Sequence, residues 1–211
     1  QNAIDLAMKG RYTTSPNPNV GCVIVEGNKI LSRSYHAKSG KDHAEVIALK
    51  KLKKKVNNQM VMYLNLEPCC HTGKTGPCTK TIIESGIKNV EIAMFDPNPV
   101  VKGNGVKELR KNGITVNVGL CKNEAIEINN DFITRHNKNR PYVVLKQAIS
   151  ADFRITNPQN RWISSKLSRE DSHFHRAESC AILVGSNTVR NDNPRLNVRL
   201  TKKKLLISES I

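Results

Sequence analysis

Apolar runs and segments of helical periodicity alternate along most of the chain. Continuous apolar runs rich in β-branched residues predict strands, and apolar positions that recur every three or four residues predict amphipathic helices. The predicted strands are residues 20–25, 29–35, 60–66, 90–95 and 114–118. The predicted helices are residues 3–9, 44–52, 79–85, 105–111 and 124–135. Because strands alternate with helices, the pattern predicts a layered α/β sandwich.

A polar stretch that ends in proline interrupts this pattern at residues 137–141. Such a composition is typical of a linker between folding units. Two further apolar runs, residues 142–148 and 181–185, predict strands of a second unit. We therefore expect two domains, residues 1–139 and residues 140–211.

The charge of the chain raises the question of a nucleic-acid partner. The formal net charge is +16, as in many nucleic-acid-binding proteins. The lysines are nevertheless spread along the chain, and those at residues 50–55 fit the solvated face and end of a helix. No aromatic residues interleave with them to stack on bases. We therefore expect no nucleic acid as partner, and a phosphorylated small molecule also suits a basic protein.

The chain carries no pattern that predicts membrane insertion or export. It has no apolar run of about 18 residues and no signal-peptide pattern, so a cytoplasmic location without membrane contact is expected. Because the chain begins at Gln1, a short N-terminal piece is expected to be missing. In a reducing compartment, the six cysteines are expected to be core thiols, metal ligands or nucleophiles rather than disulfides.

The residues with the clearest chemical meaning are His43, Glu45, Cys69 and Cys78. One imidazole and two thiolates provide the three protein ligands of a catalytic zinc, whose fourth position stays open for water. Glu45 lies on the same predicted helical turn as His43, so it can take a proton from that water and deliver it to a leaving nitrogen. Both cysteines follow a proline at or before a predicted helix start, where the helix dipole favours thiolate. This order of residues is the signature of zinc-dependent nucleobase deaminases.

The interval between the two cysteines departs from that signature, and a structural zinc site is the alternative. Residues 70–77 separate Cys69 from Cys78, whereas the common form is the shorter Cys-x-x-Cys. Cys70 or His71 could supply a fourth ligand and close the site, as in structural zinc sites. The acid beside His43 favours the catalytic interpretation.

The long cysteine loop, Glu-Pro-Cys-Cys-His-Thr-Gly-Lys-Thr-Gly-Pro-Cys at residues 67–78, resembles the deaminase domain of the bifunctional RibD family of riboflavin biosynthesis. The same resemblance is carried by Pro-Asn-Pro-Asn-Val-Gly at residues 16–21, by His36, by His-Ala-Glu at residues 43–45 and by Asp-Pro-Asn-Pro at residues 96–99. It extends over roughly residues 4–199. The resemblance implies a three-layer cytidine deaminase-like sandwich with a mixed sheet.

The resemblance also implies a reaction and the residues that perform it. The reaction is the hydrolytic deamination of 2,5-diamino-6-ribosylamino-4(3H)-pyrimidinone 5′-phosphate to 5-amino-6-ribosylaminouracil 5′-phosphate and ammonia. By resemblance, His43, Cys69 and Cys78 bind Zn²⁺, and Glu45 is the proton shuttle. The implied contacts to the pyrimidine, ribose and phosphate are Asn17, His36, Lys74, Asp96 and Asn98. An ammonium in a glycine-flanked loop could hold the phosphate, although an ordinary solvated lysine is the alternative for Lys74.

Residues 140–211 resemble the opening part of the reductase domain of the same family, so a partial reductase-like α/β segment is expected. The resemblance implies NADPH contacts at Ala148, Trp162, Thr188 and Asp192, and contacts to the ribosyl substrate at Arg176, Leu196 and Arg199. Phe153 stands where the family has a glycine, which often permits a backbone angle that other residues do not reproduce. Because the chain also ends before the later strands of such a domain, we expect NADPH-dependent activity to be absent or incomplete, and NADPH to bind only if the segment is functional.

Two other interpretations compete with a small-molecule deaminase. A transfer-RNA-type base deaminase would use the basic surface, but the long cysteine loop and the loop at residues 96–99 argue against it. A non-catalytic zinc module left by gene decay is the other alternative, and the intact set of His43, Glu45, Cys69 and Cys78 argues against decay. The family context also predicts self-association and makes a separate reductase a candidate partner.

Overall fold

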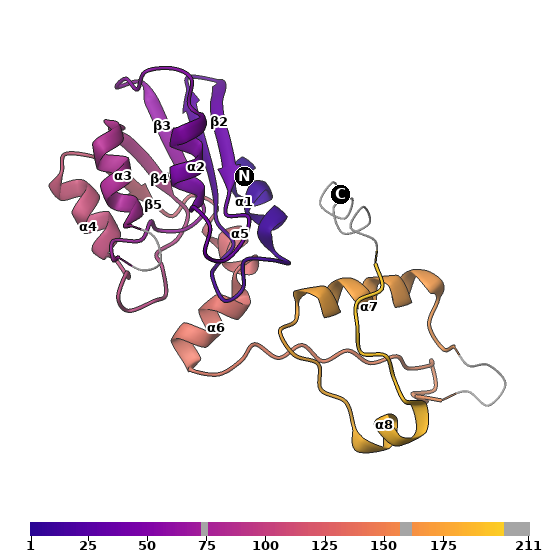
Figure 1. The fold of residues 1–211 in the computed structure, drawn as a ribbon. Helices are drawn as coiled ribbons and strands as arrows, with labels where there is room; N and C mark the ends of the chain where they lie inside the picture. The colour runs from indigo at the N-terminus through magenta and orange to yellow at the C-terminus, as the bar shows by residue number, and fades with distance from the viewer. Residues whose placement is uncertain (73–75, 157–161, 201–211) are drawn as a thin grey trace. The chain divides into compact units, whose positions relative to one another are not determined.

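The computed structural model describes residues 1–72, 76–156 and 162–200. The chain divides into two compact units, Gln1–Tyr142 and Val143–Ile211 (Figure 1). Across the described residues, no helix is both long enough and apolar enough to cross a membrane.

A five-stranded mixed sheet in the order β2-β1-β3-β4-β5 runs through the first unit. The strands are β1 (Gly21–Glu26), β2 (Lys29–Tyr35), β3 (Met60–Leu64), β4 (Asn89–Ile92) and β5 (Thr115–Val118). Strand β1 pairs antiparallel with β2 and β3, whereas β3, β4 and β5 are parallel. A tight turn suffices between β1 and β2, but the parallel strands need helical crossovers. The predicted alternation of strands and helices in this unit is confirmed.

Helices cover both faces of this sheet. On one face, α2 (Ala44–Lys51), α3 (Cys78–Ser85) and α4 (Asn104–Lys111) lie side by side over a core of buried apolar side chains from the sheet and these helices (Figure 1). On the other face, α1 (Asn2–Ala7), continued by the 3-10 helix η1 (Met8–Gly10), packs on β1. Gly21 permits this close approach, because a Cβ there would lie 1.9 Å from the carbonyl oxygen of Ala3. The predicted three-layer sandwich is confirmed.

Two short helices, α5 (Lys122–Glu127) and α6 (Asn130–Lys138), replace the single helix predicted at residues 124–135. The break lies at Asn129, whose backbone has φ −127° and ψ 23°. The Asn129 side chain is fully buried and bonds to the backbone of Asn19 instead of facing solvent. The apolar periodicity continues across the break, so the prediction of one helix was wrong for a reason that lies in a distant segment.

The second unit contains α7 (Lys166–Glu178) and α8 (Ser186–Asp192), and its described residues form no strand. The strands predicted at residues 142–148 and 181–185 are therefore wrong. Side chains of these runs are exposed rather than packed, with Leu145 at 79% and Leu183 at 97%. An apolar run becomes a strand only when a neighbouring strand satisfies its backbone N–H and C=O groups. In its described residues, the expected reductase-like segment is thus present as two helices and chain without regular secondary structure.

Candidate functional site

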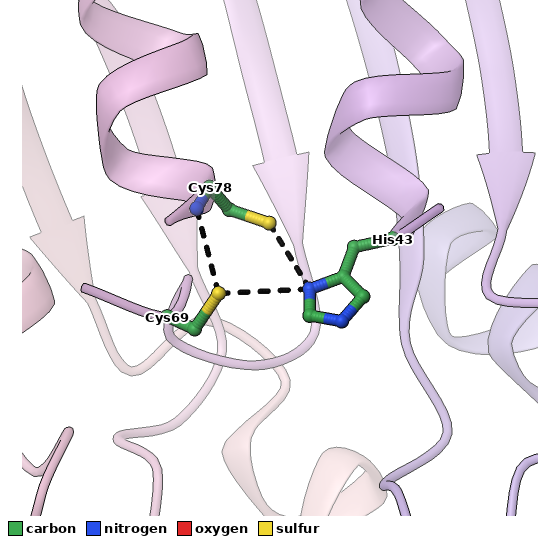
Figure 2. Close-up of side chains that lie close together, drawn as sticks. All are labelled: His43, Cys69 and Cys78. Carbon is green, nitrogen blue, oxygen red and sulfur yellow. Dashed lines mark hydrogen bonds between the residues drawn. The ribbon is translucent and has the colours of Figure 1, made fainter. Parts of the chain in front are cut away.

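The start of α2 carries two of the candidate residues. His43 is the N-cap residue of this helix, with extended backbone angles, and Glu45 lies in the first turn, as predicted. The Nδ1 atom of His43 lies 3.1 Å from Cys78 Sγ and 3.6 Å from Cys69 Sγ (Figure 2). The imidazole therefore turns its Nδ1 atom toward both thiols.

The two cysteines meet at the first turn of α3. Cys78 is the first residue of this helix, after the N-cap Pro77, whereas Cys69 lies in the loop that follows β3. The Cys78 N–H donates to Cys69 Sγ at 3.4 Å, and the Thr79 N–H donates to the Cys69 carbonyl oxygen at 3.2 Å. The long cysteine loop thus returns to its starting point, and the Cys78 N–H at the start of the helix stabilises a thiolate on Cys69.

The charges of these groups are strongly coupled. A hydrogen bond from Cys78, followed by one from His43, lowers the pKa of the Cys69 thiol to about 4, against the effect of burial. The same contact with the Cys69 thiolate, together with burial, raises the pKa of Cys78. The hydrogen bond with Cys69 raises the pKa of His43. A proton thus stays on Cys78 beside a Cys69 thiolate, and a divalent cation bound by the three groups would displace it.

Three potential metal ligands converge in the described part of the chain. The side-chain nitrogen of His43 and the sulfur atoms of Cys69 and Cys78 all lie within 4.8 Å of one another. The Cys70 sulfur instead faces the carbonyl oxygen of Val100 at 3.9 Å, and His71 is exposed. One nitrogen and two sulfur ligands suit Zn²⁺, and a set of three leaves the fourth tetrahedral position open. The donor set therefore fits a catalytic rather than a closed structural zinc site.

Glu45 is a buried acid beside these ligands. Its side chain is 3% exposed, and burial raises its pKa, an effect that the positive charge of His43 partly opposes. Its Oε2 atom is buried and has no hydrogen-bond partner in the described structure. An unsatisfied buried acceptor is costly, so its presence next to the ligand set fits a group that receives a proton from a bound molecule.

Asn17 and His36 lie together next to His43. The His36 ring meets the His43 ring edge-on, with 5.2 Å between the ring centroids. His36 Nδ1 lies 3.1 Å from the carbonyl oxygen of Asp42, which can only accept, and His36 Nε2 lies 3.2 Å from Asn17 Nδ2. These partners favour a neutral ring with the proton on Nδ1, and burial lowers the pKa of His36 in the same sense.

Asp96 and Asn98 lie in the loop after β4. Asp96 is 7% exposed, and burial, followed by the charges of Glu67 and Cys69, raises its pKa to about 6. One Asp96 carboxylate oxygen accepts the Asn98 N–H at 2.8 Å. Asp96 therefore lies within the electrostatic reach of Cys69. The remaining candidate for substrate contact, Lys74, lies outside the described residues.

Sequence reasoning missed three buried polar residues that hold these loops in place. Asn65 accepts the Gly21 N–H and donates to the Asn19 carbonyl oxygen, both at 2.8 Å. Asn129 and Glu67 likewise bond to the backbone of distant loops. For Asn65 and Glu67, the available signal was polar residues inside or directly after an apolar strand run. Asn129 carried no comparable signal, because asparagine is common on helix surfaces.

In the second unit, two of the residues implied for the reductase-like segment lie together. Arg176 donates to the Asn197 carbonyl oxygen, and Arg199 donates to Asn197 Oδ1, both at 2.9 Å. The guanidinium carbon of Arg169 lies over the Trp162 ring, 4.3 Å from the ring centroid. Ala148 and Leu196 lie outside the helices of this unit, and Thr188 and Asp192 lie in α8. These positions stay predictions as cofactor or substrate contacts.

Comparisons with known proteins match both parts of the chain. The zinc-binding region of cytidine and deoxycytidylate deaminases matches residues 1–94, and the RibD C-terminal domain matches residues 141–206. The riboflavin biosynthesis protein RibD of Aquifex aeolicus is 48% identical over 199 residues, which are 93% of this chain and 56% of that protein. The chain thus spans about half the length of the curated relatives it matches.

Solved structures agree with this result. A structure of Acinetobacter baumannii RibD superposes with a TM-score of 0.88 at 40% identity, covering 95% of this chain and 56% of that one. The diaminohydroxyphosphoribosylaminopyrimidine deaminase/5-amino-6-(5-phosphoribosylamino)uracil reductase of Thermotoga maritima superposes equally well, at 43% identity over 95% of this chain and 58% of that one. The resemblance inferred from the cysteine loop is confirmed: the chain belongs to the RibD family of riboflavin biosynthesis proteins.

Proposed function

We propose that this chain is a zinc-dependent deaminase that converts 2,5-diamino-6-ribosylamino-4(3H)-pyrimidinone 5′-phosphate into 5-amino-6-ribosylaminouracil 5′-phosphate and ammonia. One observation carries the proposal: His43, Cys69 and Cys78 converge beside Glu45, a buried acid with an unpaired oxygen. Family membership supplies the substrate. Curated relatives from Aquifex aeolicus and Escherichia coli are RibD proteins, which favours this substrate over that of a transfer-RNA-type base deaminase.

His43, Cys69 and Cys78 are the residues that would hold the zinc ion. When bound, zinc acts as a Lewis acid that lowers the pKa of a water molecule toward neutrality. Glu45 takes a proton from the attacking water and delivers it to the 2-amino group. Water adds to the ring carbon, the carbon–nitrogen bond breaks, and ammonia leaves while the ring keeps the oxygen. The raised pKa of Glu45 suits both halves of this transfer, because a general acid–base group works best when its pKa lies nearer the working pH.

The other candidate residues would orient the substrate. His36 holds Asn17 through its Nε2 atom, which leaves the Asn17 carbonyl oxygen free to accept from the pyrimidine ring. On the family resemblance, Asp96 and Asn98 stay candidate contacts to the pyrimidine, ribose or phosphate, and we assign Lys74 to the phosphate. A lysine suits the last role as a point charge.

For the second unit, the proposed roles rest on the family resemblance alone. Ala148, Trp162, Thr188 and Asp192 stay candidate NADPH contacts, conditional on a functional reductase-like part, and Arg176, Leu196 and Arg199 stay candidate contacts to the ribosyl substrate. Self-association, a separate reductase partner and a cytoplasmic location are predictions of the same kind.

The decisive experiment measures zinc content and ammonia release on the same preparation. We expect about one zinc per chain and steady ammonia release from the diaminopyrimidine phosphate. The deaminated product is the matched control, since it lacks the 2-amino group and can release none at this position. A zinc-loaded protein that releases ammonia from transfer RNA, but none from the diaminopyrimidine, would overturn the proposal.

A further inference from the structure

Glu67 is a buried carboxylate to which the proposed reaction gives no role. It is 3% exposed and lies two residues before Cys69. Its Oε2 accepts the N–H groups of Asp96 at 3.1 Å and Gly103 at 2.9 Å, and its Oε1 accepts the Val106 N–H at 3.0 Å. A single side chain on the cysteine loop therefore binds three backbone donors of the segment after β4.

Two of these donors belong to the beginning of α4. The helix has Gly103 as its N-cap residue, so it has no capping side chain of its own. The Glu67 carboxylate supplies the missing acceptor from a distant part of the chain, and its negative charge also suits the positive end of the helix dipole. The approach is close, because a Cβ on Gly105 would lie 2.3 Å from the carbonyl oxygen of Pro68.

The third donor is the N–H of Asp96, which is itself a proposed substrate contact. Asp96 gives its N–H to Glu67 and accepts the N–H of Asn98 on its own carboxylate at 2.8 Å. The Asn98 side chain in turn accepts the Val100 N–H at 3.1 Å. The Glu67 backbone N–H also donates to the Met94 carbonyl oxygen at 3.0 Å. The loop with Asp96 and Asn98 is thereby tied, through one residue, to the loop with Cys69.

We propose that Glu67 is a positioning residue, which holds the substrate-contacting loop at residues 96–98 in a set place relative to the metal ligand Cys69. The inference rests on the proposed function. A substrate bound to both loops needs them in a constant relation, because a displaced loop makes weaker contacts to the substrate, which raises KM more than it lowers kcat. Hydrogen bonds to a carboxylate are suited to this task, since they are stronger than bonds between neutral groups.

The test variant is Glu67→Gln, which keeps the volume but turns an amide NH₂ group toward backbone N–H donors. We expect zinc to be retained, KM for the diaminopyrimidine phosphate to rise about 10- to 100-fold, and kcat to change less. Glu91→Gln is the matched control: Glu91 lies on β4 and bonds to the Asn117 side chain at 2.7 Å, so the same substitution there should leave KM unchanged.

A double-mutant cycle separates positioning from a general structural role. If Glu67 acts through the loop, then Glu67→Gln and Asn98→Ala together should raise KM by less than the product of their single effects. If the KM of the double variant rises by the full product of the two single effects, the proposal is overturned. Wild-type kinetics in Glu67→Gln would overturn it as well. If the Gln variant loses zinc or does not fold, Glu67→Asp, which keeps the charge but shortens the reach, is held to the same criteria.

Amide hydrogen exchange tests the same contacts without turnover. Exchange at Asp96, Gly103 and Val106 should be faster in Glu67→Gln than in Glu91→Gln. Unchanged exchange would overturn the proposal even if KM rises. If the wild-type protein releases no ammonia, the proposed function fails on its own, and the exchange rates still show whether Glu67 holds the loop.

Discussion

Asn19 and Asn129 exchange hydrogen bonds although they lie 110 residues apart in the chain. The Asn19 N–H donates to Asn129 Oδ1 at 2.8 Å, and Asn129 Nδ2 donates to the Asn19 carbonyl oxygen at 3.1 Å. The Arg135 guanidinium also donates to the Pro16 carbonyl oxygen at 2.8 Å. The loop with Asn17 is therefore held by helices from the far end of the same unit, which makes these helices part of the site's support.

We predict that Asn129→Ala lowers the free energy of unfolding by about 1–3 kcal/mol, because the half-buried N–H of Asn19 loses its acceptor and a second bond is lost as well. Urea denaturation of the first unit measures the change. Asn123→Ala, on the exposed surface of α5, is the control and should stay within about 0.5 kcal/mol of wild type. Equal stability of the two variants would contradict the structural role of Asn129.

Glu45→Gln should retain zinc and lose nearly all deaminase turnover. The substitution preserves the shape of the buried side chain but removes its capacity to carry a proton. General acid–base groups contribute about 10²- to 10⁴-fold in rate, and Glu45 is used twice in one cycle. Metal analysis and ammonia release on the same preparation test the prediction, and a zinc-loaded Glu45→Gln enzyme with wild-type turnover would refute the assigned role.

Substitution of any of the three converging side chains should have a different effect on zinc binding from substitution of the neighbouring Cys70. His43→Ala, Cys69→Ser and Cys78→Ser should each lose zinc and activity, because a catalytic site with three protein ligands has none to spare. Cys70→Ser should keep both, since the Cys70 sulfur faces the Val100 carbonyl oxygen rather than the ligand set. Zinc loss on changing Cys70 would instead favour a closed structural site.

Asp96 should make the stability of the zinc-free protein depend on pH. Its pKa is raised from the ordinary aspartate value to about 6, mainly by burial, so the folded state binds this proton more tightly than the unfolded state. The sign follows directly: the contribution of Asp96 is present at low pH and is lost as the pH rises through about 6. Asp96→Asn should therefore be more stable relative to wild type at pH 7 than at pH 4, by up to about 3 kcal/mol. Urea denaturation at both values tests this, and an equal difference at the two values would show that Asp96 does not titrate as described.

Phe153 occupies a backbone conformation that suits glycine. Its φ angle is +61°, and its side chain is 81% exposed, so the ring contributes little packing that could offset the strain. Phe153→Gly should therefore stabilise the turn between Ser150 and Arg154 by about 1 kcal/mol, whereas Phe153→Ala, which keeps the Cβ, should not. Slower exchange of the Ser150 and Phe153 amides, which form the turn's hydrogen bonds, is the measurement. The idea fails if alanine and glycine have the same effect.

The sequence by itself determined the order of strands and helices in the first unit, the helix start that carries His43 and Glu45, and the family. These features depend on local periodicity and on residue chemistry within short segments. For Phe153, the family resemblance implies a glycine at this position, and the structure has a positive φ angle there that suits glycine.

Only the tertiary structure decided which groups meet across the chain. It turned His43 Nδ1 toward both thiols, placed Glu67 under the start of α4, and used Asn129 to interrupt a helix whose periodicity was continuous. It also left the apolar runs around Leu145 and Leu183 without paired strands. The reason is the same in each case: hydrogen bonds between segments depend on which backbone groups face one another after folding, and a local sequence pattern carries no record of its distant partners.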